Sequence, residues 1–493
     1  MIKILDAAQV SLSEILAREE EKQDISGIVS GIIADVRKNG DSALLRYAKE
    51  FDGAELEALE VPREQLNKAL ADMDPGLRTV LEEAAENIRA FHRRQVQNGF
   101  VVSEKAGIVL GQKVTPIGKV GIYIPGGTAP LPSTVLMDCI PAKIAGCPEI
   151  IMVSPPACNG DIHSAILAAA CIAGVDRVFR CGGAQAVAAL TYGTETVPRV
   201  DKIAGPGNAF VAEAKRQVFG KVGIDMIAGP SDILVIADGN SDARHVAADL
   251  LSQAEHDRNA CAVLVTDSAL LAGSVAKEIE AQLASLPRQE IARASIESAG
   301  KIILTKDIPE AVRIANALAP EHMELCLDNP FDYLNEVKNA GSIFLGRNTT
   351  EALGDYFAGT NHTLPTYGTA RFSSPLSVED FVKKSQFIYY SDAAMSEASP
   401  KVAAFARLES LEGHARSPLS RIDQPHIRTG ATRKIISAKD EKSGIRYKII
   451  YVTEKNCYEL WSANPQGERH LVTRGTETEV RAEYDKFIPN EKE

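Results

Sequence analysis

The sequence has little or none of three features that would assign it to a specialised class of protein. Its eight cysteines are scattered, and no two have C-x-x-C spacing, which argues against a thiolate metal site and a disulfide framework. No apolar run reaches the roughly 20 residues that a membrane helix needs. The N-terminal segment MIKILDAAQVSLSEILAREEEKQ has no basic stretch followed by a long apolar core, so it does not read as a signal peptide. We therefore expect a protein of a reducing compartment, the cytoplasm.

The chain also lacks an excess of positive charge. Its 54 Lys and Arg residues are outnumbered by 66 Asp and Glu residues, which gives a net charge of −12. This balance disfavours non-specific binding to nucleic acid and to anionic membranes, so we expect neither as a partner. With 493 residues, 45% of them hydrophobic and 24% charged, the chain suits a folded protein of several domains.

Helix and strand patterns alternate along most of the chain. The first hundred residues read as helices, with apolar residues at i, i+3, i+4 spacing in 26–51 and 75–95. From about residue 118, Ala-rich helical stretches separate short β-branched runs. These runs are 119–124, 149–153, 176–179, 232–237, 261–265, 301–304 and 342–345. The pattern predicts a doubly wound α/β architecture, with parallel sheets covered on both faces, and the length allows two such units.

A change of composition near residue 425 predicts a further module. The runs IRYKIIYVT, CYELWS and RHLVT read as strands, and the only tryptophan, Trp461, lies in the second of them. Thr476 and Glu479 have capping-box spacing at the start of a helix that should run to about Phe487. We expect a β-β-β-α module with its own core over residues 435–493.

The dinucleotide fingerprint G-x-G-x-x-G is absent. The segment 205–208, Gly-Pro-Gly-Asn, has its first two glycines but not the third. Further glycine-rich turns at 125–127, 182–183 and 229–231 are expected beyond the carboxyl ends of strands, where ligands bind in open α/β sheets. Taken alone, each glycine is explained equally well by a tight turn.

Compact metal motifs such as H-E-x-x-H are absent too. Gln253 and His256 are three residues apart, which puts both side chains on one face of a helix. Asp355 and His362 share the loop GDYFAGTNH, and His414 lies near the end of a later helix. Asp and His are ordinary zinc ligands, whereas Gln is unusual. Spacing alone leaves open whether these residues bind a metal or only face solvent.

Glu321 and His322 follow Ala319-Pro320, which ends the preceding helix. Because adjacent residues do not share a helix face, we expect both in a loop that leads to one site. A histidine beside a carboxylate can act as a general base near neutral pH. The alternative is an exposed pair without a role.

Several long blocks nevertheless occur together in one order. They are VGIYIPGGTAPLPSTVLM, GGAQAVAALTYGTETVPRVDKIAGPGNAFVAEAKRQV, IDMIAGPSDILVIAD, DLLSQAEHD, APEHMEL, GDYFAGTNHTLPT and FARLESLEGH. In this order they resemble the histidinol dehydrogenase family, over roughly residues 10–420. The resemblance implies two NAD-dependent oxidations at one carbon, from L-histidinol through L-histidinaldehyde to L-histidine, the last step of histidine biosynthesis.

The resemblance also implies a role for each candidate residue. The expected ligands of one zinc ion per subunit are Gln253, His256, Asp355 and His414. His322 would take the hydroxyl proton, and Glu321 would activate the water that adds to the aldehyde. The other expected substrate contacts are Ser231, His362 and Glu409, and the expected NAD contacts are Tyr123, Gln185 and Asn208.

The domain organisation follows from the same resemblance. It implies two incomplete Rossmann-like units, the first formed by residues 21–122 and 233–375 and the second by residues 123–232. An N-terminal helical segment, 1–20, and a helical tail, 376–425, would flank them. In a homodimer the tail, with Glu409 and His414, would complete the active site of the partner.

Other functions stay open. A sister dehydrogenase could keep the zinc and the Glu-His pair but oxidise another small polar alcohol. A zinc hydrolase could use the same ligands with a glutamate base, although the NAD-like blocks argue against it, and a non-catalytic binding protein fits least. The C-terminal module could bind a partner, bind a regulator such as the pathway product, or brace the dimer. We favour a structural or interaction role for it.

Overall fold

The structure is a computed structural model that describes residues 2–17, 24–126, 130–422, 432–440, 443–452 and 456–487. It divides into two compact units, the first made of Met1–Phe100 and Gln112–Gln386 and the second of Val101–Gly111 and Phe387–Glu493. No helix among the described residues combines the length and the apolar character that crossing a membrane requires.

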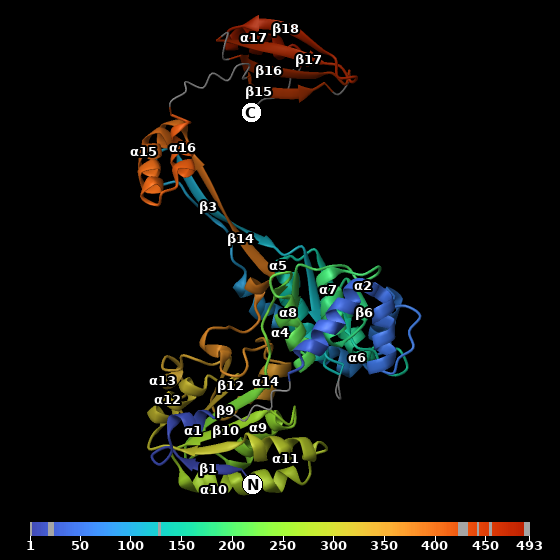
Figure 1. Cartoon of the computed structure of the whole chain (residues 1–493), viewed down its shortest axis with the longest axis vertical. Helices are drawn as coiled ribbons and strands as arrows, with labels where there is room; N and C mark the ends of the chain where they lie inside the picture. Colours follow the sequence, from blue (N-terminus) through green and yellow to red (C-terminus); the bar gives the residue numbers. More distant parts are fainter. Residues whose placement is uncertain are drawn as a thin grey trace. The chain divides into compact units, whose positions relative to one another are not determined.

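A six-stranded sheet in the first unit has the order β1-β11-β10-β9-β12-β13, and its paired strands are parallel (Figure 1). Its strands are β1 (Lys3–Asp6), β9 (Asp232–Ala237), β10 (Cys261–Thr266), β11 (Lys301–Leu304), β12 (His322–Cys326) and β13 (Ser342–Leu345). Helices cover both faces: on one face α9 (Ala243–Ala254), α10 (Ala269–Leu283) and α11 (Gln289–Ser298), on the other α1 (Leu12–Leu16) and α12 (Ile308–Leu318). The central strands are therefore buried on both sides, which explains their continuous apolar runs.

A second, five-stranded parallel sheet has the order β6-β5-β4-β7-β8. Its strands are β4 (Lys119–Tyr123), β5 (Glu149–Ser154), β6 (Arg177–Arg180), β7 (Lys202–Ala204) and β8 (Gly223–Ile224). Inner helices α5 (Pro132–Ala145) and α6 (Ser164–Ala173) cover one face, and α7 (Gly183–Tyr192) and α8 (Ala209–Val218) cover the other. Outside them pack α2 (Ser26–Phe51), α3 (Arg63–Ala71) and α4 (Pro75–His92).

Both sheets share one topology. Apart from the edge strand β1, three successive strands run outward from the centre of each sheet, β9 to β11 in one and β4 to β6 in the other, and the next two strands lie on the other side of the first of these three. This is the order of a Rossmann-like half, and the expected doubly wound α/β fold with two such units is confirmed. The switch point lies between β4 and β7 in one sheet and between β9 and β12 in the other.

The N-terminal helices belong to a different sheet from the one expected. Val29 and Leu44 of α2 join the core on one face of the five-stranded sheet, and Leu66 of α3 and Ile88 of α4 join the core on its other face. The expected grouping of residues 21–122 with 233–375 therefore does not match the packing. An apolar helix face shows that a helix is covered, but not which of two similar sheets covers it.

The expected helical segment 1–20 also needs correction, because its first residues form β1, which pairs in parallel with β11. The four-residue run KILD is too short to show a period, so pairing with an existing sheet edge decides its conformation. Met1 and residues 18–23 lie outside the described residues.

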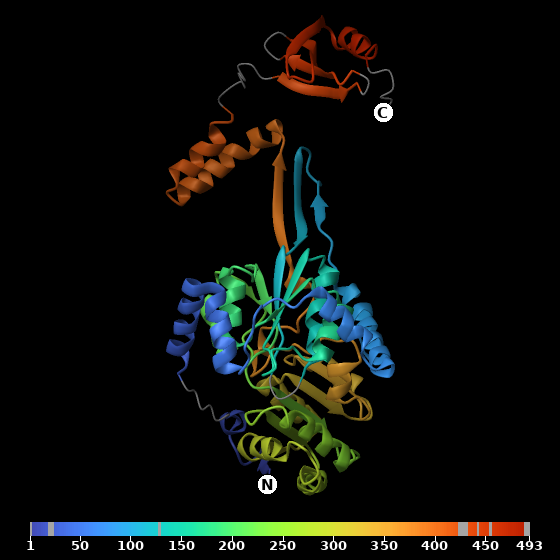
Figure 2. The same ribbon diagram turned by 90° about the vertical axis from the view of Figure 1, so that its right-hand side faces the viewer.

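Three strands were not expected: β2 (Phe100–Val102), β3 (Ile108–Pro116) and β14 (Val382–Tyr390), which form a sheet of order β14-β3-β2. The tail 376–425 is thus not wholly helical, although α15 (Asp392–Leu408) and α16 (Glu412–Leu419) pack together within it (Figure 2). All residues of β14 but the first are exposed in this chain. Without a buried face there is no apolar alternation from which to predict a strand.

The C-terminal module is a four-stranded antiparallel sheet with a helix against it (Figure 2). Its elements are β15 (Thr432–Lys439), β16 (Arg446–Val452), β17 (Cys457–Ala463), β18 (Arg469–Gly475) and α17 (Glu477–Tyr484). Tyr447, Leu460 and Tyr484 lie in a core that belongs to the module, and the expected capping box opens α17. The expected β-β-β-α pattern lacked β15, whose pairing with β16 is interrupted by a shift of register. The boundary expected near residue 425 falls in 423–431, outside the described residues.

Candidate functional site

A cluster of metal-ligating side chains joins the end of α9 to the short helix α14 (Glu351–Tyr356). One ligand atom each of His256, Glu351 and Asp355 lies within 4.8 Å of the others. Gln253, one turn before His256, is 1% exposed, and among the described residues its Oε1 has no hydrogen-bond partner. A buried acceptor without a donor costs stability unless a cation or a ligand satisfies it. The nitrogen and oxygen donors gathered here fit a zinc ion.

Glu351 was not among the expected residues. It is 2% exposed and precedes Asp355 by four residues, so the two carboxylates share one face of α14. Burial raises the pKa of Glu351 to about 8. Burial also opposes ionisation of Asp355, but the hydrogen bond and charge of His322 hold its pKa below the usual range. The acidic pair at i, i+4 spacing was a signal that the sequence contained.

Glu321 and His322 lie against the start of β9. The main-chain nitrogen of Asp232 donates to Glu321 Oε2 at 3.1 Å, and the nitrogen of Glu321 donates to Asp232 Oδ1 at 2.8 Å. Glu321 and His322 are 5% and 3% exposed, so they are not an exposed pair. His322 is also the first residue of β12 instead of a loop residue, because parallel pairing with β9 extends the strand to it.

The contacts of His322 define its hydrogen-bonding state. Nδ1 lies 3.2 Å from the main-chain oxygen of Asp232, which can only accept, so Nδ1 carries the proton. Nε2 then faces Asp355 Oδ1 at 3.5 Å. Burial lowers the pKa of His322, but the charges of Glu351, Glu321 and Asp355 raise it more, to a value well above the usual one. Burial is also the main reason why the pKa of Glu321 rises to about 7.

Asp232 is the second residue that the sequence interpretation missed. It is 1% exposed, and its Oδ2 accepts from the main-chain nitrogen of Tyr367 at 3.3 Å. Its side chain and backbone therefore hold Glu321, His322 and the 366–367 turn together. An acidic residue that opens the otherwise apolar strand DILVIA was the available signal.

Asp232 and the Glu321–His322 pair lie at the amino ends of β9 and β12, not at the carboxyl ends of these strands. Ser231, half-buried, directly precedes β9, and the nitrogen of Gly229 donates to Thr366 Oγ1 at 2.6 Å. The expectation that the 229–231 turn lies beyond the carboxyl end of a strand is therefore wrong. The preceding strand β8 has two residues and ends at Ile224, so this turn belongs to the entry into β9.

The expected NAD contacts lie at the carboxyl ends of three strands of the other sheet. Tyr123 ends β4, Gln185 lies in the first turn of α7 after β6, and Asn208 caps α8 after β7. The nitrogen of Gly183 donates to the Tyr123 hydroxyl at 3.1 Å, which joins the first two of these positions. This edge contains the β4–β7 switch point, where ligands of open α/β sheets bind.

The segment 205–208 has a structural explanation of its own. Gly205 has φ +115°, and a Cβ there would collide with the carbonyl oxygen of Tyr123. Its nitrogen donates to Asp225 Oδ2 at 2.8 Å, and its oxygen accepts from Lys215 Nζ at 3.0 Å. Lys215 and Asp225 also form an ion pair with side chains 2% and 1% exposed. A buried pair thus holds the turn before Asn208. Gly127, in the turn expected at 125–127, lies outside the described residues.

The remaining expected residues divide between the two units. His362 belongs to the first unit, where its Nδ1 lies 3.1 Å from the main-chain oxygen of Asp355. Glu409, at the end of α15, and His414, on α16, belong to the second unit, and both are exposed there.

The fold and the site define an α/β enzyme in which one sheet edge has the topology of a nucleotide-binding site and the other sheet carries a buried Glu-His pair. The relatives of this chain show that it is an NAD-dependent oxidoreductase. The sequence model of the family described as histidinol dehydrogenase matches residues 16–422. The chain is 53% identical to a histidinol dehydrogenase of Halalkalibacterium halodurans over 389 residues, 79% of this chain and 92% of that protein. It is 51% identical to one of Clostridium acetobutylicum over 398 residues, 81% of this chain and 92% of that protein.

A solved structure agrees with these relatives. The histidinol dehydrogenase of Elizabethkingia anophelis has a TM-score of 0.82 and 38% identity, covering 85% of this chain and 98% of that one. The chain belongs to the histidinol dehydrogenase family. The family match ends at residue 422, so the C-terminal module lies outside it.

Proposed function

We propose that this chain oxidises L-histidinol to L-histidine in two successive NAD-dependent steps. The observation that carries the proposal is the buried Glu321–His322 pair, fixed by Asp232 beside the cluster of His256, Glu351 and Asp355. One site thus contains a proton acceptor and side chains that could hold a metal ion, to which an imidazole-containing substrate can bind.

His322 acts as the base in the first step. Its Nδ1 proton is engaged by Asp232. A zinc ion held by Asp355 would offset the negative charge that raises the pKa of His322, so that the ring is neutral and Nε2 takes the hydroxyl proton of the substrate. Asp355, 3.5 Å from Nε2, then stabilises the imidazolium that forms. Glu321, with its pKa raised to about 7, exchanges a proton near neutral pH and activates the water that adds to the aldehyde.

Two groups complete the chemistry. Gln253, His256 and Asp355, with the His414 that the second unit of the partner chain supplies, would hold one zinc ion, which when bound would orient the amine and imidazole nitrogens of the substrate. NAD, when bound, accepts the hydride in both oxidations. We assign its contacts to Tyr123, Gln185 and Asn208 at the β4–β7 edge.

The further substrate contacts in this proposal are Ser231, His362 and Glu409, and Glu409 would pair with the substrate ammonium group.

The active enzyme is proposed to be a homodimer in which the second unit of one chain completes the site of the other. Support comes from large apolar side chains that this unit exposes in a single chain, including Ile388 at 72%, Phe405 at 66% and Leu408 at 81%. Such a surface normally marks a protein interface. A cytoplasmic location is part of the same proposal, because eight free cysteines suit a reducing compartment.

The direct test of the function adds L-histidinol and NAD to the purified protein and counts NADH. Two NADH per histidinol, abolished by a chelator and restored by zinc, are expected. One NADH, or none, would favour a sister dehydrogenase with another alcohol substrate.

Shared sites are tested by mixing His414→Ala and His322→Ala proteins under conditions that let subunits exchange. Each variant lacks a different group of the same site, so mixed dimers should regain part of the activity. Proven exchange without regained activity would contradict the shared-site proposal.

A further inference from the structure

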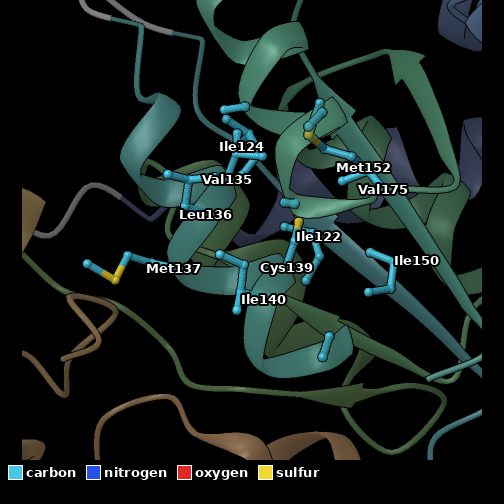
Figure 3. Close-up of a cluster of buried hydrophobic side chains, with 14 of the residues drawn as sticks. Ile122, Ile124, Val135, Leu136, Met137, Cys139, Ile140, Ile150, Met152 and Val175 are labelled. Atoms are coloured by element: carbon cyan, nitrogen blue, oxygen red, sulfur yellow. The ribbon is translucent and has the colours of Figure 1, made fainter. Parts of the chain in front are cut away.

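Helix α5 is anchored in the half of the first unit that carries the expected NAD contacts. It follows β4, the strand that ends at Tyr123. Its side chains Val135, Leu136, Cys139 and Ile140 are buried to 1% exposure or less in the core around β4 and β5 (Figure 3). This packing gives the helix a defined position relative to the cofactor edge.

A polar face of the same helix contacts the 361–363 segment, which follows α14, the helix that carries Glu351 and Asp355. Thr134 and Asp138 are four residues apart, on one side of α5, and are 2% and 0% exposed. The hydroxyl of Thr363 donates to Asp138 Oδ1 at 2.6 Å. Next to it, Asn361 Nδ2 donates to a main-chain oxygen of α5 at 2.7 Å. Residues more than two hundred positions apart thus form one buried polar contact.

Between these two bonds, His362 connects α5 to Asp355. The main-chain oxygen of Asp355 can only accept, so the 3.1 Å contact places a proton on His362 Nδ1. In the neutral ring Nε2 is then an acceptor, and the Thr134 hydroxyl donates to it at 3.2 Å.

We propose that Thr134 and Asp138 are positioning residues for the oxidation, which hold the 361–363 segment and, through His362, the backbone of Asp355 against the helix that follows the cofactor-binding strand. The proposal rests on the proposed function, because it assigns these bonds the task of keeping the substrate side in register with the NAD side. Hydride transfer needs the reacting atoms about 3–3.5 Å apart, and an error of about 1 Å can cost about 10²-fold in rate.

The test is the substitution Thr134→Val, which keeps the shape of the side chain and removes only the hydroxyl. We expect kcat with L-histidinol to fall about tenfold to a hundredfold, with an unchanged KM for NAD and little change in Tm. Thr134→Ser, which restores a hydroxyl, should recover most of the loss. Thr363→Val, which removes the bond to Asp138, should act in the same direction.

Two controls separate positioning from stability. Thr191 is also buried in a helix, but its hydroxyl donates within α7, to Val187, so Thr191→Val should leave kcat unchanged. In a His362→Ala background, Thr134→Val should cause no further loss, because Thr134 acts through His362. An unchanged kcat in Thr134→Val, or an equal loss in Thr191→Val, would overturn the proposal.

A readout without turnover keeps this result independent of the proposed function. Zinc affinity, measured by competition with a chromophoric chelator, should fall several-fold in Thr134→Val and recover in Thr134→Ser, because Asp355 is displaced. If the wild-type protein does not oxidise L-histidinol, the proposed function fails, and the zinc measurement alone decides the inference. Equal zinc affinity in that case would overturn it.

Discussion

Nε2 of His322 lies 3.5 Å from Oδ1 of Asp355, while Nδ1 of the same ring lies 3.2 Å from the main-chain oxygen of Asp232. The ring is therefore held between the start of β9 and helix α14. One nitrogen has a fixed proton, and the other faces a carboxylate that can stabilise a second. This relationship makes His322 a base whose tautomer is set by the backbone.

Asp232→Asn should disturb this arrangement. Both carboxylate oxygens of Asp232 accept bonds from main-chain nitrogens, and an amide would turn an NH₂ group toward one of these donors. We expect a loss of about 1–3 kcal/mol in the free energy of unfolding. Because Glu321 and His322 shift with it, kcat should fall about tenfold or more. Urea unfolding and steady-state kinetics measure the two effects.

The matched control for this variant is Asp238→Asn. Asp238 directly follows β9 at its opposite end and pairs with Arg347, so its loss should leave kcat unchanged. A wild-type kcat in Asp232→Asn would show that Asp232 does not position the pair.

The second oxidation should depend on pH through Glu321. Its pKa is raised to about 7, mainly by burial, so the carboxylate that activates water forms only as the pH rises through that value. With L-histidinaldehyde as substrate, kcat should therefore rise between about pH 6 and 8. Glu321→Gln should lower kcat and abolish this limb of the profile. A limb that persists in the variant would have to come from another group.

Ionisation of the buried Asp138 should make the folded protein less stable as the pH rises. Burial raises its folded-state pKa to about 8 from an ordinary value of 3.8, so the folded state favours the protonated carboxyl. The contribution of this group is favourable at low pH and is lost as the pH rises from about 4 to 8, by up to about 1.4 kcal/mol per pH unit. Asp138→Asn cannot ionise. It should therefore gain stability relative to the wild type as the pH rises, which urea unfolding at pH 5 and pH 8 would measure.

The buried ion pair of Lys215 and Asp225 should stabilise the turn at Gly205. Lys215→Met leaves the carboxylate without its cation in a buried place, and we expect a cost of about 3–5 kcal/mol in the free energy of unfolding. The double variant Lys215→Met, Asp225→Asn should lose less, because no charge stays buried. The KM for NAD should rise in both. An unchanged KM for NAD would separate this pair from the cofactor edge.

Truncation after residue 431 should leave the enzyme intact. The C-terminal module has its own core and lies beyond the family match, which ends at residue 422. We expect unchanged kcat, KM, inhibition by histidine and oligomeric state, measured by kinetics and light scattering. A change in product inhibition or in assembly would instead give the module a regulatory or bracing role.

The sequence by itself determined the class of fold, because helix and strand periods are local and the central strands, buried on both faces, have continuous apolar runs. It also contained the ordered blocks that identify the family. It did not show which sheet α2, α3 and α4 would cover, because an apolar helix face does not distinguish between two similar sheets. It could not predict β14, whose residues after the first are exposed in a single chain.

Only the tertiary structure decided the relations across the chain. Asp232 and Glu321 are 89 positions apart and exchange two hydrogen bonds, and Thr134 and His362 are 228 positions apart and share one. The first bonds depend on the parallel pairing of β9 with β12, and the last on how α5 packs against the 361–363 segment, and no local pattern encodes either. For the same reason the sequence placed the 229–231 turn beyond the carboxyl end of a strand, whereas it lies with the Glu-His pair at the amino ends of β9 and β12.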